Sequence, residues 1–345
     1  MQNQKKYTIK EIARYAGVAP STVSRVLNNT LTSIPVTEKT KKKILFAVKK
    51  FDYSPNVNAK RLSAKKTFVI GLQVPADETS TCHAFSDHTL VETMRGIEDI
   101  VKNSEYKLLI IFKTGEYFRN DEYIRLFKEK NLDGLIIWGE NDNYSYKEDI
   151  LEYPVVFINS RPAEPQNINF ITHDNYGASF TLTEYLIHKG YRDFLYFTGS
   201  ECLSITRERK AGFLDALKKH SVKIDDSNII SSNYISDMGF KIMDRILTEK
   251  KLSFDAAVCI NDSTAAGVYQ ASVKHSKKIP GDFALTGGDG VDVFREGYLP
   301  FTTFRVNCFE MGRRAVQRVF DLIDGKSEAP LIEKLKVEFV IGETA

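Results

Sequence analysis

The chain has few cysteines, and none stands at a metal-binding or redox spacing. The four are scattered and form no CxxC pair: Cys82, Cys202, Cys259 and Cys308. Scattered cysteines are typical of free thiols in a reducing compartment, so we expect neither a disulfide framework nor a zinc site. Cys259 lies inside an apolar run, where we expect a buried small hydrophobic residue.

Long hydrophobic stretches are also missing. No run approaches the roughly 18 apolar residues of a membrane span, and residues 1–6 lack the apolar region of a signal peptide. We therefore expect a cytoplasmic protein that does not enter a membrane. With 42% hydrophobic and 27% charged residues, the 345-residue chain is long enough for two or three domains with buried cores.

Sequence motifs of catalysis are absent as well. The six histidines show no metal spacing such as HExxH, and no GxSxG motif occurs. Residues 287–290 are rich in glycine but lack the spacing of a phosphate-binding loop. Asp262 and Asp289 would suit a carboxylate pair on an enzyme, although binding of ligand hydroxyls explains them more simply. The sequence predicts no enzyme, no metal site and no cofactor.

Charge is divided unevenly along the chain. Residues 1–66 hold 15 Lys and Arg against 3 Asp and Glu, whereas residues 67–345 hold 33 against 42. The overall net charge of +3 therefore hides a basic N-terminal part and an acidic remainder. This asymmetry indicates a polyanionic partner for the N-terminal part alone.

Residues 8–28 have the pattern of two short helices joined by a tight turn. Thr8 and Glu11 have capping-box spacing, so a helix is expected to begin at Ile9. Gly17 supplies the positive φ that ends it, and Pro20 or Ser21 begins the next helix. The apolar stripe of the first helix consists of Ile9, Ile12, Ala13 and Ala16.

The second of these helices has a polar side that suits DNA. Its inward side carries Val23, Val26 and Leu27, and its opposite side carries Ser21, Arg25 and Asn28. A polar and cationic face near a helix N-terminus is what reading base edges in the major groove requires. The alternative is a plain helical hairpin with a solvated face, and the basic charge of residues 1–66 argues against it.

A third helix and a short linker helix are predicted next. The third helix runs from about Thr37 to Phe51 and completes a three-helix domain, with an apolar stripe of Ile44, Leu45, Val48 and Phe51. Residues 57–63 form a short helical possibility on which Leu62 stands among lysine and arginine. Leu62 is either a stray apolar residue in a linker or a wedge that enters the minor groove when the segment folds on DNA.

From Phe68 onward, short apolar runs alternate with amphipathic segments. The runs are residues 68–74, 108–112, 134–138, 155–158, 194–197, 256–260 and 283–285. Such runs are typical of buried parallel strands, and the length of this part suits two α/β sheets better than one. Ligands of such sheets lie beyond the carboxyl ends of the strands.

These motifs together resemble the LacI/GalR family of bacterial transcription regulators. The resemblance rests on Thr8–Ala13, Ala16–Val18, Ser21–Asn28, and Tyr53–Asn56 followed by Ala59 and Leu62. It implies an α/β fold: an N-terminal helix-turn-helix domain of three helices, a hinge helix, and a type I periplasmic-binding-protein-like core of two α/β subdomains. It also implies a homodimer that binds double-stranded operator DNA.

The resemblance implies the following boundaries. The helix-turn-helix domain covers residues 1–54, the hinge helix and linker 55–67, and the core 68–345. Within the core, the N-subdomain covers about 68–164 and 304–326, and the C-subdomain about 165–303 and 327–345. An effector is expected in the cleft between the subdomains.

The resemblance also implies the residues that contact DNA. Pro20, Ser21 and Arg25 stand where family members read major-groove bases, and Arg25 suits bidentate recognition of guanine. Thr22 and Ser24 stand at phosphate-contacting or helix-supporting places. Leu62 matches the hinge leucine that members insert at the operator centre. The full set of implied DNA contacts is Thr8, Pro20, Ser21, Thr22, Ser24, Arg25, Asn28, Ala59 and Leu62.

Five residues are implied for the effector site, which in most members takes a sugar or sugar derivative: Asn159, Arg209, Tyr234, Asn261 and Asp289. A guanidinium suits paired sugar oxygens, although Arg209 could instead form a surface ion pair with Glu208 or Asp215. Tyr234 could be a packing tyrosine, and many members have Asp at the position of Asn159.

Two further expectations concern neighbours of these residues. Asp262 is expected to cap the helix that follows it. The 76–88 loop is atypical of the family, and its Phe85 could either close over a ligand or join the core.

The predicted function is a transcription regulator, most simply a repressor of a carbohydrate-utilisation operon that a sugar releases from DNA. The resemblance to the family suggests a galactoside as the effector. Corepression, in which the effector strengthens DNA binding, is the open alternative to release. A plain solute-binding protein is a second class, which the basic N-terminal part argues against. The absence of a C-terminal leucine heptad predicts a dimer rather than a tetramer, and a phosphocarrier-protein partner is left open.

Overall fold

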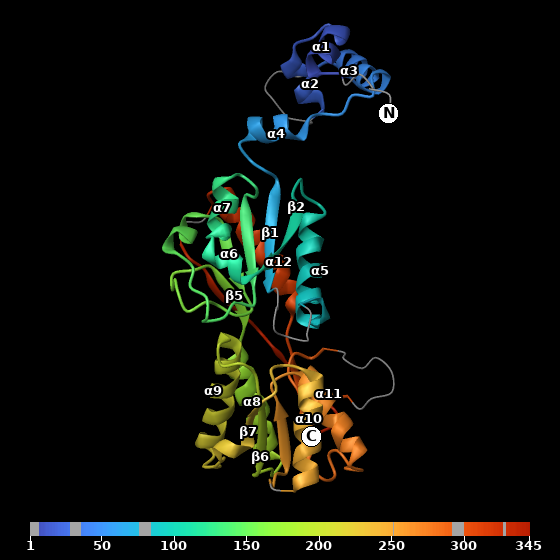
Figure 1. Cartoon of the computed structure of the whole chain (residues 1–345). Helices are drawn as coiled ribbons and strands as arrows, with labels where there is room; N and C mark the ends of the chain where they lie inside the picture. The colour runs from blue at the N-terminus through green and yellow to red at the C-terminus, as the bar shows by residue number, and fades with distance from the viewer. Residues whose placement is uncertain (1–6, 28–35, 76–83, 251, 292–299, 327–328) are drawn as a thin grey trace. The chain divides into compact units, whose positions relative to one another are not determined.

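The fold was analysed on a computed structural model, which describes residues 7–27, 36–75, 84–250, 252–291, 300–326 and 329–345. The chain divides into two compact units, residues 1–67 and residues 68–345. Figure 1 shows the first as a cluster of helices and the second as two α/β layers of strands and helices. Among the described residues, no helix combines the length and the apolar character that crossing a membrane requires.

The first unit is a bundle of three helices followed by a fourth. Its elements are α1 (Ile9–Ala16), α2 (Pro20–Leu27), α3 (Glu38–Lys50) and α4 (Val57–Ala64). Its small core consists of Ile12, Ala13, Ala16, Val23, Ile44 and Ala47. Leu45, which the sequence assigned to the apolar stripe of α3, is 45% exposed, because Ala47 takes the inward position instead.

The second unit contains two parallel sheets. The first sheet has the strand order β11-β5-β4-β3-β1-β2 and the second β7-β6-β8-β9, as predicted for a two-subdomain α/β core. The strands of the first sheet are β1 (Val69–Pro75), β2 (Lys107–Lys113), β3 (Gly134–Trp138), β4 (Val155–Ile158), β5 (Phe170–His173) and β11 (Ile332–Leu335). Those of the second are β6 (Phe194–Thr198), β7 (Ile229–Ser231), β8 (Ala256–Cys259) and β9 (Ala284–Thr286).

Helices cover both faces of each sheet, as the alternating pattern requires. On the first sheet, α5 (His88–Val101) and α12 (Cys308–Ile323) cover one face, and α6 (Gly115–Arg119) and α7 (Glu122–Lys128) the other. On the second sheet, α8 (Asn175–His188) and α9 (Ser204–Lys219) lie opposite α10 (Ser236–Glu249) and α11 (Asp262–Lys274). A short antiparallel pair, β10 (Thr303–Arg305) and β12 (Glu338–Val340), completes the unit.

The chain crosses between the two sheets later than expected at two of three places. The predicted boundaries near 165 and 327 assigned β5 and β11 to the C-subdomain. The structure corrects both, because β5 pairs with β4 and β11 pairs with β5 inside the first sheet. The predicted boundary near 304 agrees with α12, which packs on the first sheet.

Two glycines bring α5 and α12 into backbone contact. A Cβ on Gly96 would overlap the carbonyl oxygen of Phe309, and a Cβ on Gly312 would overlap that of Thr93. Helices approach this closely only where a side chain is absent from the contact. The two helices therefore form one tightly packed pair on the first sheet.

Candidate functional site

The first helix of the N-terminal unit is capped at both ends as predicted. The backbone N–H of Thr8 donates to Glu11 Oε2 at 2.7 Å, and the backbone N–H of Glu11 donates to the Thr8 hydroxyl at 3.4 Å. This completes the capping box, so the Thr8 hydroxyl is engaged in the cap. Gly17 ends the helix at φ 68°, and Pro20 begins α2, where a missing N–H costs nothing.

The exposed side of α2 carries the residues that the sequence assigned to DNA. Pro20 and Ser21 are exposed, whereas Val23 is fully buried against the other helices. The Arg25 guanidinium donates to the Thr22 hydroxyl at 3.2 Å, which holds Arg25 along the helix surface. Ser24 is half-buried. Asn28 lies outside the described residues.

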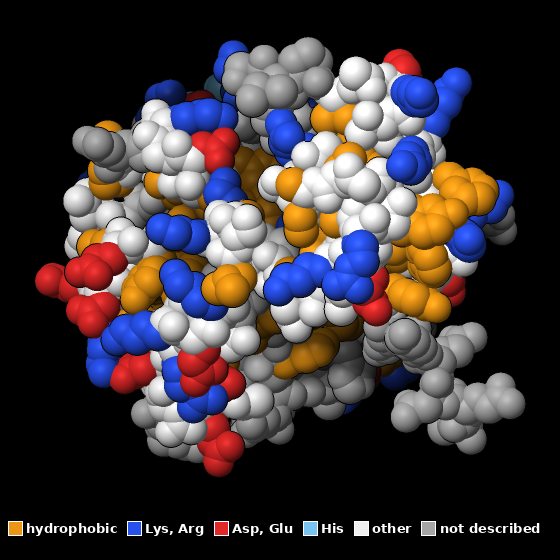
Figure 2. All heavy atoms as spheres, turned by 90° about the horizontal axis from the view of Figure 1, so that it is seen from above, with side chains coloured by type: hydrophobic (Ala, Val, Ile, Leu, Met, Phe, Trp, Pro, Cys, Tyr) orange, Lys and Arg blue, Asp and Glu red, His pale blue; other side chains and the backbone are white. Residues whose placement is uncertain are grey.

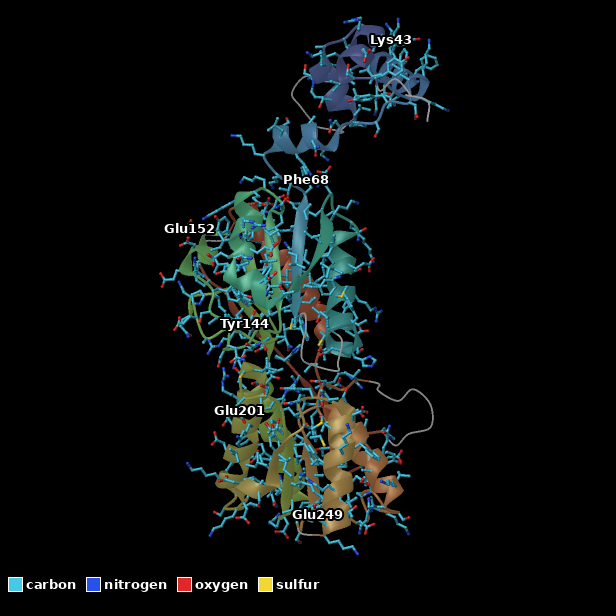
Figure 3. The ribbon with its side chains drawn as sticks, in the orientation of Figure 1. Lys43, Phe68, Tyr144, Glu152, Glu201 and Glu249 are labelled. Atoms are coloured by element: carbon cyan, nitrogen blue, oxygen red, sulfur yellow. The ribbon has the colours of Figure 1, made fainter. Side chains whose placement is uncertain are left out.

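Lysines surround this helical unit. The last turn of α3 carries Lys49 and Lys50. Figure 3 places Lys43 on the outer side of the unit. Figure 2 shows Lys and Arg side chains spread over the face that it views. A polyanion that met this unit would be attracted before any base contact formed.

The short helix α4 presents an unpartnered leucine. Asn56 caps it by accepting from the backbone N–H of Asn58 at 2.9 Å. Leu62 is 83% exposed, the largest exposure among the large hydrophobic residues of the described chain. Ala59 is also exposed and lies one helical turn before Leu62, on the same face. A helix of eight residues gains little stability from its own hydrogen bonds.

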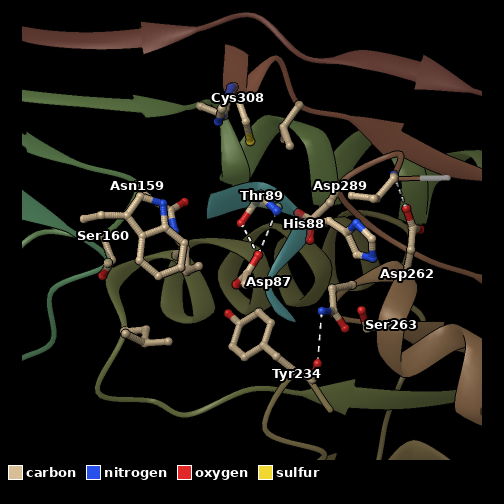
Figure 4. Close-up of a pocket in the computed structure, with 18 of the residues that line it drawn as sticks. Asp87, His88, Thr89, Asn159, Ser160, Tyr234, Asp262, Ser263, Asp289 and Cys308 are labelled. Atoms are coloured by element: carbon tan, nitrogen blue, oxygen red, sulfur yellow. Dashed lines mark hydrogen bonds between the residues drawn. The ribbon is translucent and has the colours of Figure 1, made fainter. Parts of the chain in front are cut away.

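The second unit contains a cleft between its two subdomains. It encloses about 290 Å³ and is lined from β1, β3, β4 and β5 on one side and from β8, α9 and the segment after β9 on the other. All five residues that the sequence assigned to an effector site line this cleft: Asn159, Arg209, Tyr234, Asn261 and Asp289. Figure 4 shows side chains of both subdomains meeting there.

Arg209 is buried in the cleft wall. Its Nη2 donates to Asp289 Oδ1 at 2.6 Å, its Nε donates to Asn175 Oδ1 at 2.9 Å, and its Nη1 donates to the carbonyl oxygen of Ile260 at 2.7 Å. Burial by itself lowers the pKa of the guanidinium, but the Asp289 carboxylate outweighs it and raises that pKa. The alternative of a surface ion pair with Glu208 or Asp215 is wrong, because Arg209 is only 4% exposed.

Asn261 rather than Asp262 caps α11, which corrects the expected assignment. Asn261 Oδ1 accepts from the backbone N–H of Thr264 at 2.9 Å, and its Nδ2 donates to the carbonyl oxygen of Tyr234 at 3.2 Å. Asp262 lies one residue inside the helix and accepts instead from the Thr303 hydroxyl and the backbone N–H of Val291, both at 2.8 Å. Burial, reinforced by the charge of Asp289, raises the pKa of Asp262 to about 8.

Aromatic rings stand on both sides of the cleft. Tyr234 comes from the second subdomain, and its hydroxyl lies 2.7 Å from that of Thr206. Burial raises the pKa of Tyr234 to about 12, so the phenol stays neutral. Trp138 ends β3 in the first subdomain, is 8% exposed and has an indole N–H without a hydrogen-bond partner in the described chain. An aromatic ring in each subdomain's part of the lining suits the apolar faces of a ring-shaped ligand.

Asn159 follows β4 in the left-handed conformation, at φ 69°, and lines the cleft (Figure 4). Phe85 neither lines the cleft nor joins the core. It is 46% exposed, and its ring meets that of Phe112 edge-on. The preceding part of that loop, residues 76–83, lies outside the described residues.

Two further polar residues of the cleft were missed by the sequence analysis. Asp87 caps α5 by accepting from the backbone N–H of Thr89 at 2.8 Å and projects into the cleft (Figure 4). His173 ends β5 and is 2% exposed, and burial lowers its pKa to about 4. Its Nε2 has no hydrogen-bond partner in the described chain. An aspartate before a helix reads as a cap in sequence, and β5 was not predicted, so neither residue stood out.

The two subdomains already touch along one side of the cleft. The backbone N–H of Asp142 donates to the carbonyl oxygen of Cys202 at 3.0 Å, and the hydroxyls of Ser160 and Ser204 lie 3.1 Å apart. Arg207 forms an ion pair with Asp142 nearby. These contacts join the ends of β3 and β4 to the start of α9, on the side where Figure 3 labels Tyr144 and Glu201.

A basic helix-turn-helix unit joined to a two-subdomain α/β core with a polar cleft defines a ligand-responsive DNA-binding regulator. Comparison with known proteins agrees. Residues 8–56 match the family model described as bacterial regulatory proteins of the lacI family, and residues 183–345 match that of a periplasmic binding protein-like domain.

Related proteins match over nearly the whole chain. The HTH-type transcriptional repressor PurR of Vibrio parahaemolyticus is 27% identical over 98% of each chain. The structure of the Lac repressor dimer bound to operator and the anti-inducer ONPF has a TM-score of 0.81 at 21% identity and covers 99% of each chain. A complex of the regulator CelR with cellobiose has a TM-score of 0.70 at 22% identity, covering 99% of this chain and 100% of that one.

The chain belongs to the LacI family of bacterial transcription regulators. The family binds operator DNA and small-molecule effectors and functions as dimers. The chain is therefore a DNA-binding transcription regulator with a ligand-binding domain, and not an enzyme.

Proposed function

We propose that the chain represses a carbohydrate-utilisation operon and that a sugar bound in the cleft releases it from its operator. The observation that carries the proposal is the lining of the cleft. Hydrogen-bonding side chains from both subdomains line it together with two aromatic residues, Trp138 and Tyr234. This combination suits a ring with several hydroxyl groups. The solved structure of the regulator CelR with cellobiose is similar in fold to this chain.

The roles of individual residues form part of the proposal. Asp289 accepts two hydroxyl protons of the sugar, and Arg209, held by Asp289, donates to a third oxygen. Asn261 turns its amide toward the ligand while it caps α11. Tyr234 packs on the sugar face, and Asn159 supplies a donor and an acceptor from the first subdomain.

The DNA side of the proposal uses the exposed surface of α2 and the hinge helix α4. Arg25 and Ser21 read major-groove bases, Pro20 contacts a thymine methyl group, and Thr22 and Ser24 contact or orient toward phosphate. In a homodimer two α4 helices meet at Ala59 and insert Leu62 into the minor groove. Thr8 and Asn28 contact the backbone nearby. The regulator acts in the cytoplasm, where the operator is.

Effector and operator are coupled through subdomain closure. A sugar that binds one arrangement of the subdomains better than the other shifts the population of dimers that can present both α4 helices to DNA. A difference of a few kcal/mol between the two arrangements changes operator occupancy markedly.

Fluorescence anisotropy tests this function. The full-length protein is titrated onto a labelled palindromic operator from the DNA upstream of its own gene, and a panel of sugars, galactosides included, is then added. We expect one sugar to release the DNA at micromolar to millimolar concentration. Tightening of the complex by a sugar would show corepression, and release by a purine in place of any sugar would contradict a carbohydrate effector.

A further inference from the structure

Negative charge prevails in the described lining of the cleft. Asp87 comes from the first subdomain, Asp262 and Asp289 come from the second, and Arg209 is the single guanidinium in that lining. Each of the three nitrogens of Arg209 already holds a protein acceptor, and its charge is matched by Asp289. Burial keeps His173 neutral at physiological pH, since its pKa is lowered to about 4.

Asp87 and Asp262 form no ion pair in this lining, whereas Asp289 is paired with Arg209. Because the pKa of Asp262 is raised to about 8, that group is mostly protonated at neutral pH, and Asp87 is the carboxylate whose charge no cation balances. Its Oδ1 accepts from the backbone N–H and the hydroxyl of Thr89, at 2.8 and 2.6 Å, and from the backbone N–H of Leu90 at 3.4 Å. Its Oδ2 has no partner in the described part of the chain. Burial raises the pKa of Asp87, the Thr89 hydroxyl lowers it, and the charge of Asp289 on the opposite subdomain raises it again.

A second observation indicates that a polar ligand belongs beside these carboxylates. His173 lines the same cleft and is only 2% exposed, and its Nε2 has no hydrogen-bond partner in the described chain. The indole N–H of Trp138 is also buried and has no hydrogen-bond partner in the described chain. Buried polar atoms are almost always hydrogen-bonded in proteins, so two unpartnered atoms on the first-subdomain wall of the cavity point to an occupant with polar groups of its own.

We propose that Asp87 determines the charge of the effector. Asp87 and Asp289 face one another across the cleft and together take a group that donates hydrogen bonds and carries no negative charge, either neighbouring hydroxyls or a protonated amine. Sugar phosphates and uronates are rejected. This inference rests on the proposed effector cleft and adds to it the chemical class of the ligand.

The physical reason is that a phosphate or carboxylate group placed beside Asp87 and Asp289 only accepts hydrogen bonds, as the two ionised carboxylates do. Such a group would supply no donor to Asp87 Oδ2 and would add a further negative charge to a partly dehydrated site. A hydroxyl or ammonium group supplies the missing donors and relieves the repulsion between the two subdomains.

The test compares a neutral sugar with its amino, phosphate and uronate derivatives. Isothermal titration calorimetry at pH 7.5 measures binding of galactose, galactosamine, galactose 6-phosphate and galacturonate, and of the matching glucose series, to the full-length protein. The Asp87→Asn variant is measured alongside, because asparagine keeps the helix cap and removes only the charge. Asp174→Asn is the control, since Asp174 caps α8 in the same way, accepting from Gly177, but does not line the cleft.

We expect the wild-type protein and the control to bind a neutral or amino form and neither acidic form. The Asp87→Asn variant is expected to bind that form about tenfold more weakly, a change of roughly 1.4 kcal/mol, and to bind the uronate at least tenfold more tightly than wild type does. Comparison of the neutral sugar with the amino sugar shows whether the recognised donors are hydroxyl groups or an ammonium group. Preference of the wild type for an acidic form would overturn the inference and leave a sugar effector standing.

A ligand-free measurement keeps the inference separate from the identity of the sugar. Removing one of two facing charges is expected to raise the melting temperature of the Asp87→Asn variant by roughly 2 °C, whereas the Asp174→Asn control is not expected to rise. An unchanged or lowered melting temperature for Asp87→Asn would overturn the inference, even if the proposed sugar effector is found.

Discussion

The Arg209–Asp289 ion pair is buried, and this sets how its removal will act. Arg209→Ala leaves the Asp289 carboxylate in the protein interior without its guanidinium, which costs about 3–5 kcal/mol of unfolding free energy. Adding Asp289→Asn to that variant is expected to restore part of the loss. Urea denaturation of both variants measures this, with Arg207→Ala as an exposed control expected to cost at most about 1 kcal/mol. Equal losses for Arg207→Ala and Arg209→Ala would contradict the assignment.

His173 makes stability depend on pH in a defined direction. Burial lowers its folded-state pKa to about 4, against 6.5 as the ordinary value. Between these values the unfolded chain binds a proton that the folded chain does not, so stability falls as the pH is lowered from 6.5 to 4. A shift of this size corresponds to roughly 3 kcal/mol.

The comparison with His173→Gln isolates this effect, because Asp262 has a raised pKa and acts in the opposite direction over the same range. We expect the variant to lose less unfolding free energy than wild type between pH 6.5 and 4, as measured by urea denaturation at both pH values. Parallel losses in the two proteins would show that His173 is charged in the folded state.

Arg25 tests the reading surface of α2. Arg25→Ala is expected to weaken binding to the specific operator by about 1–3 kcal/mol and to relax preference at one base pair, if Arg25 contacts guanine. Fluorescence anisotropy on the operator and on single-base variants measures both quantities. Weaker binding with unchanged base preference would place Arg25 on the phosphate backbone instead.

At the scale of elements, the exposed leucine of α4 provides a separate test. Leu62 is 83% exposed in the free protein, so Leu62→Ala is expected to leave the thermal stability and the effector affinity unchanged. Operator affinity is expected to fall at least tenfold, because a wedge that holds a bent minor groove is lost. Leu45→Ala, at a 45% exposed position of α3, is the matched control. Equal effects of the two changes on operator affinity would remove Leu62 from the centre of the site.

The elements that the sequence predicted are those with strong local patterns. The capping box at Thr8, the turn at Gly17 and seven apolar strands were all predictable, because each follows from residues close together in the chain. The missed strands β5, β7, β10, β11 and β12 are three or four residues long. β11, with the sequence Ile-Glu-Lys-Leu, lies at a sheet edge, and its polar residues hide it from a search for apolar runs.

The candidate site was predictable only where family resemblance supplied the residues. Arg209, Asn261 and Asp289 lie far apart in sequence. Asn261 and Asp289 meet because they follow β8 and β9 at one edge of the second sheet, and Arg209 reaches them from α9. The roles of Asn261 and Asp262 in capping differed from expectation by one residue, since the helix begins one position earlier than a cap at Asp262 would require. Asp87 and His173 needed the fold itself. The sequence analysis singled out the 76–88 loop but considered its Phe85 rather than Asp87, and β5, which ends at His173, was not predicted.

At the scale of the whole molecule, the division of charge predicts two different responses to salt. Operator binding uses the basic N-terminal unit, so its affinity is expected to fall steeply with salt, with a log–log slope of about −0.9 for each phosphate neutralised. Effector binding uses a cleft whose ion pair is buried and is expected to change little between 50 and 200 mM salt, roughly within twofold. Anisotropy and calorimetry over the same salt series measure the two. A steep salt dependence of effector binding would contradict a neutral sugar and would indicate a charged effector such as an amino sugar.

The contact between α5 and α12 has a consequence for how this sequence can change over generations. The backbones at Gly96 and Gly312 touch, and any side chain at either position meets the carbonyl oxygen of the other helix. Exchanges on the outer surface of α5 are free of this constraint, whereas a larger residue at 96 requires a displacement of α12. Since Cys308, the first residue of α12, lines the cleft, such a displacement also moves a wall of the effector cleft. Substitutions at these two glycines during evolution are thereby expected to change ligand preference, although neither residue lines the cleft.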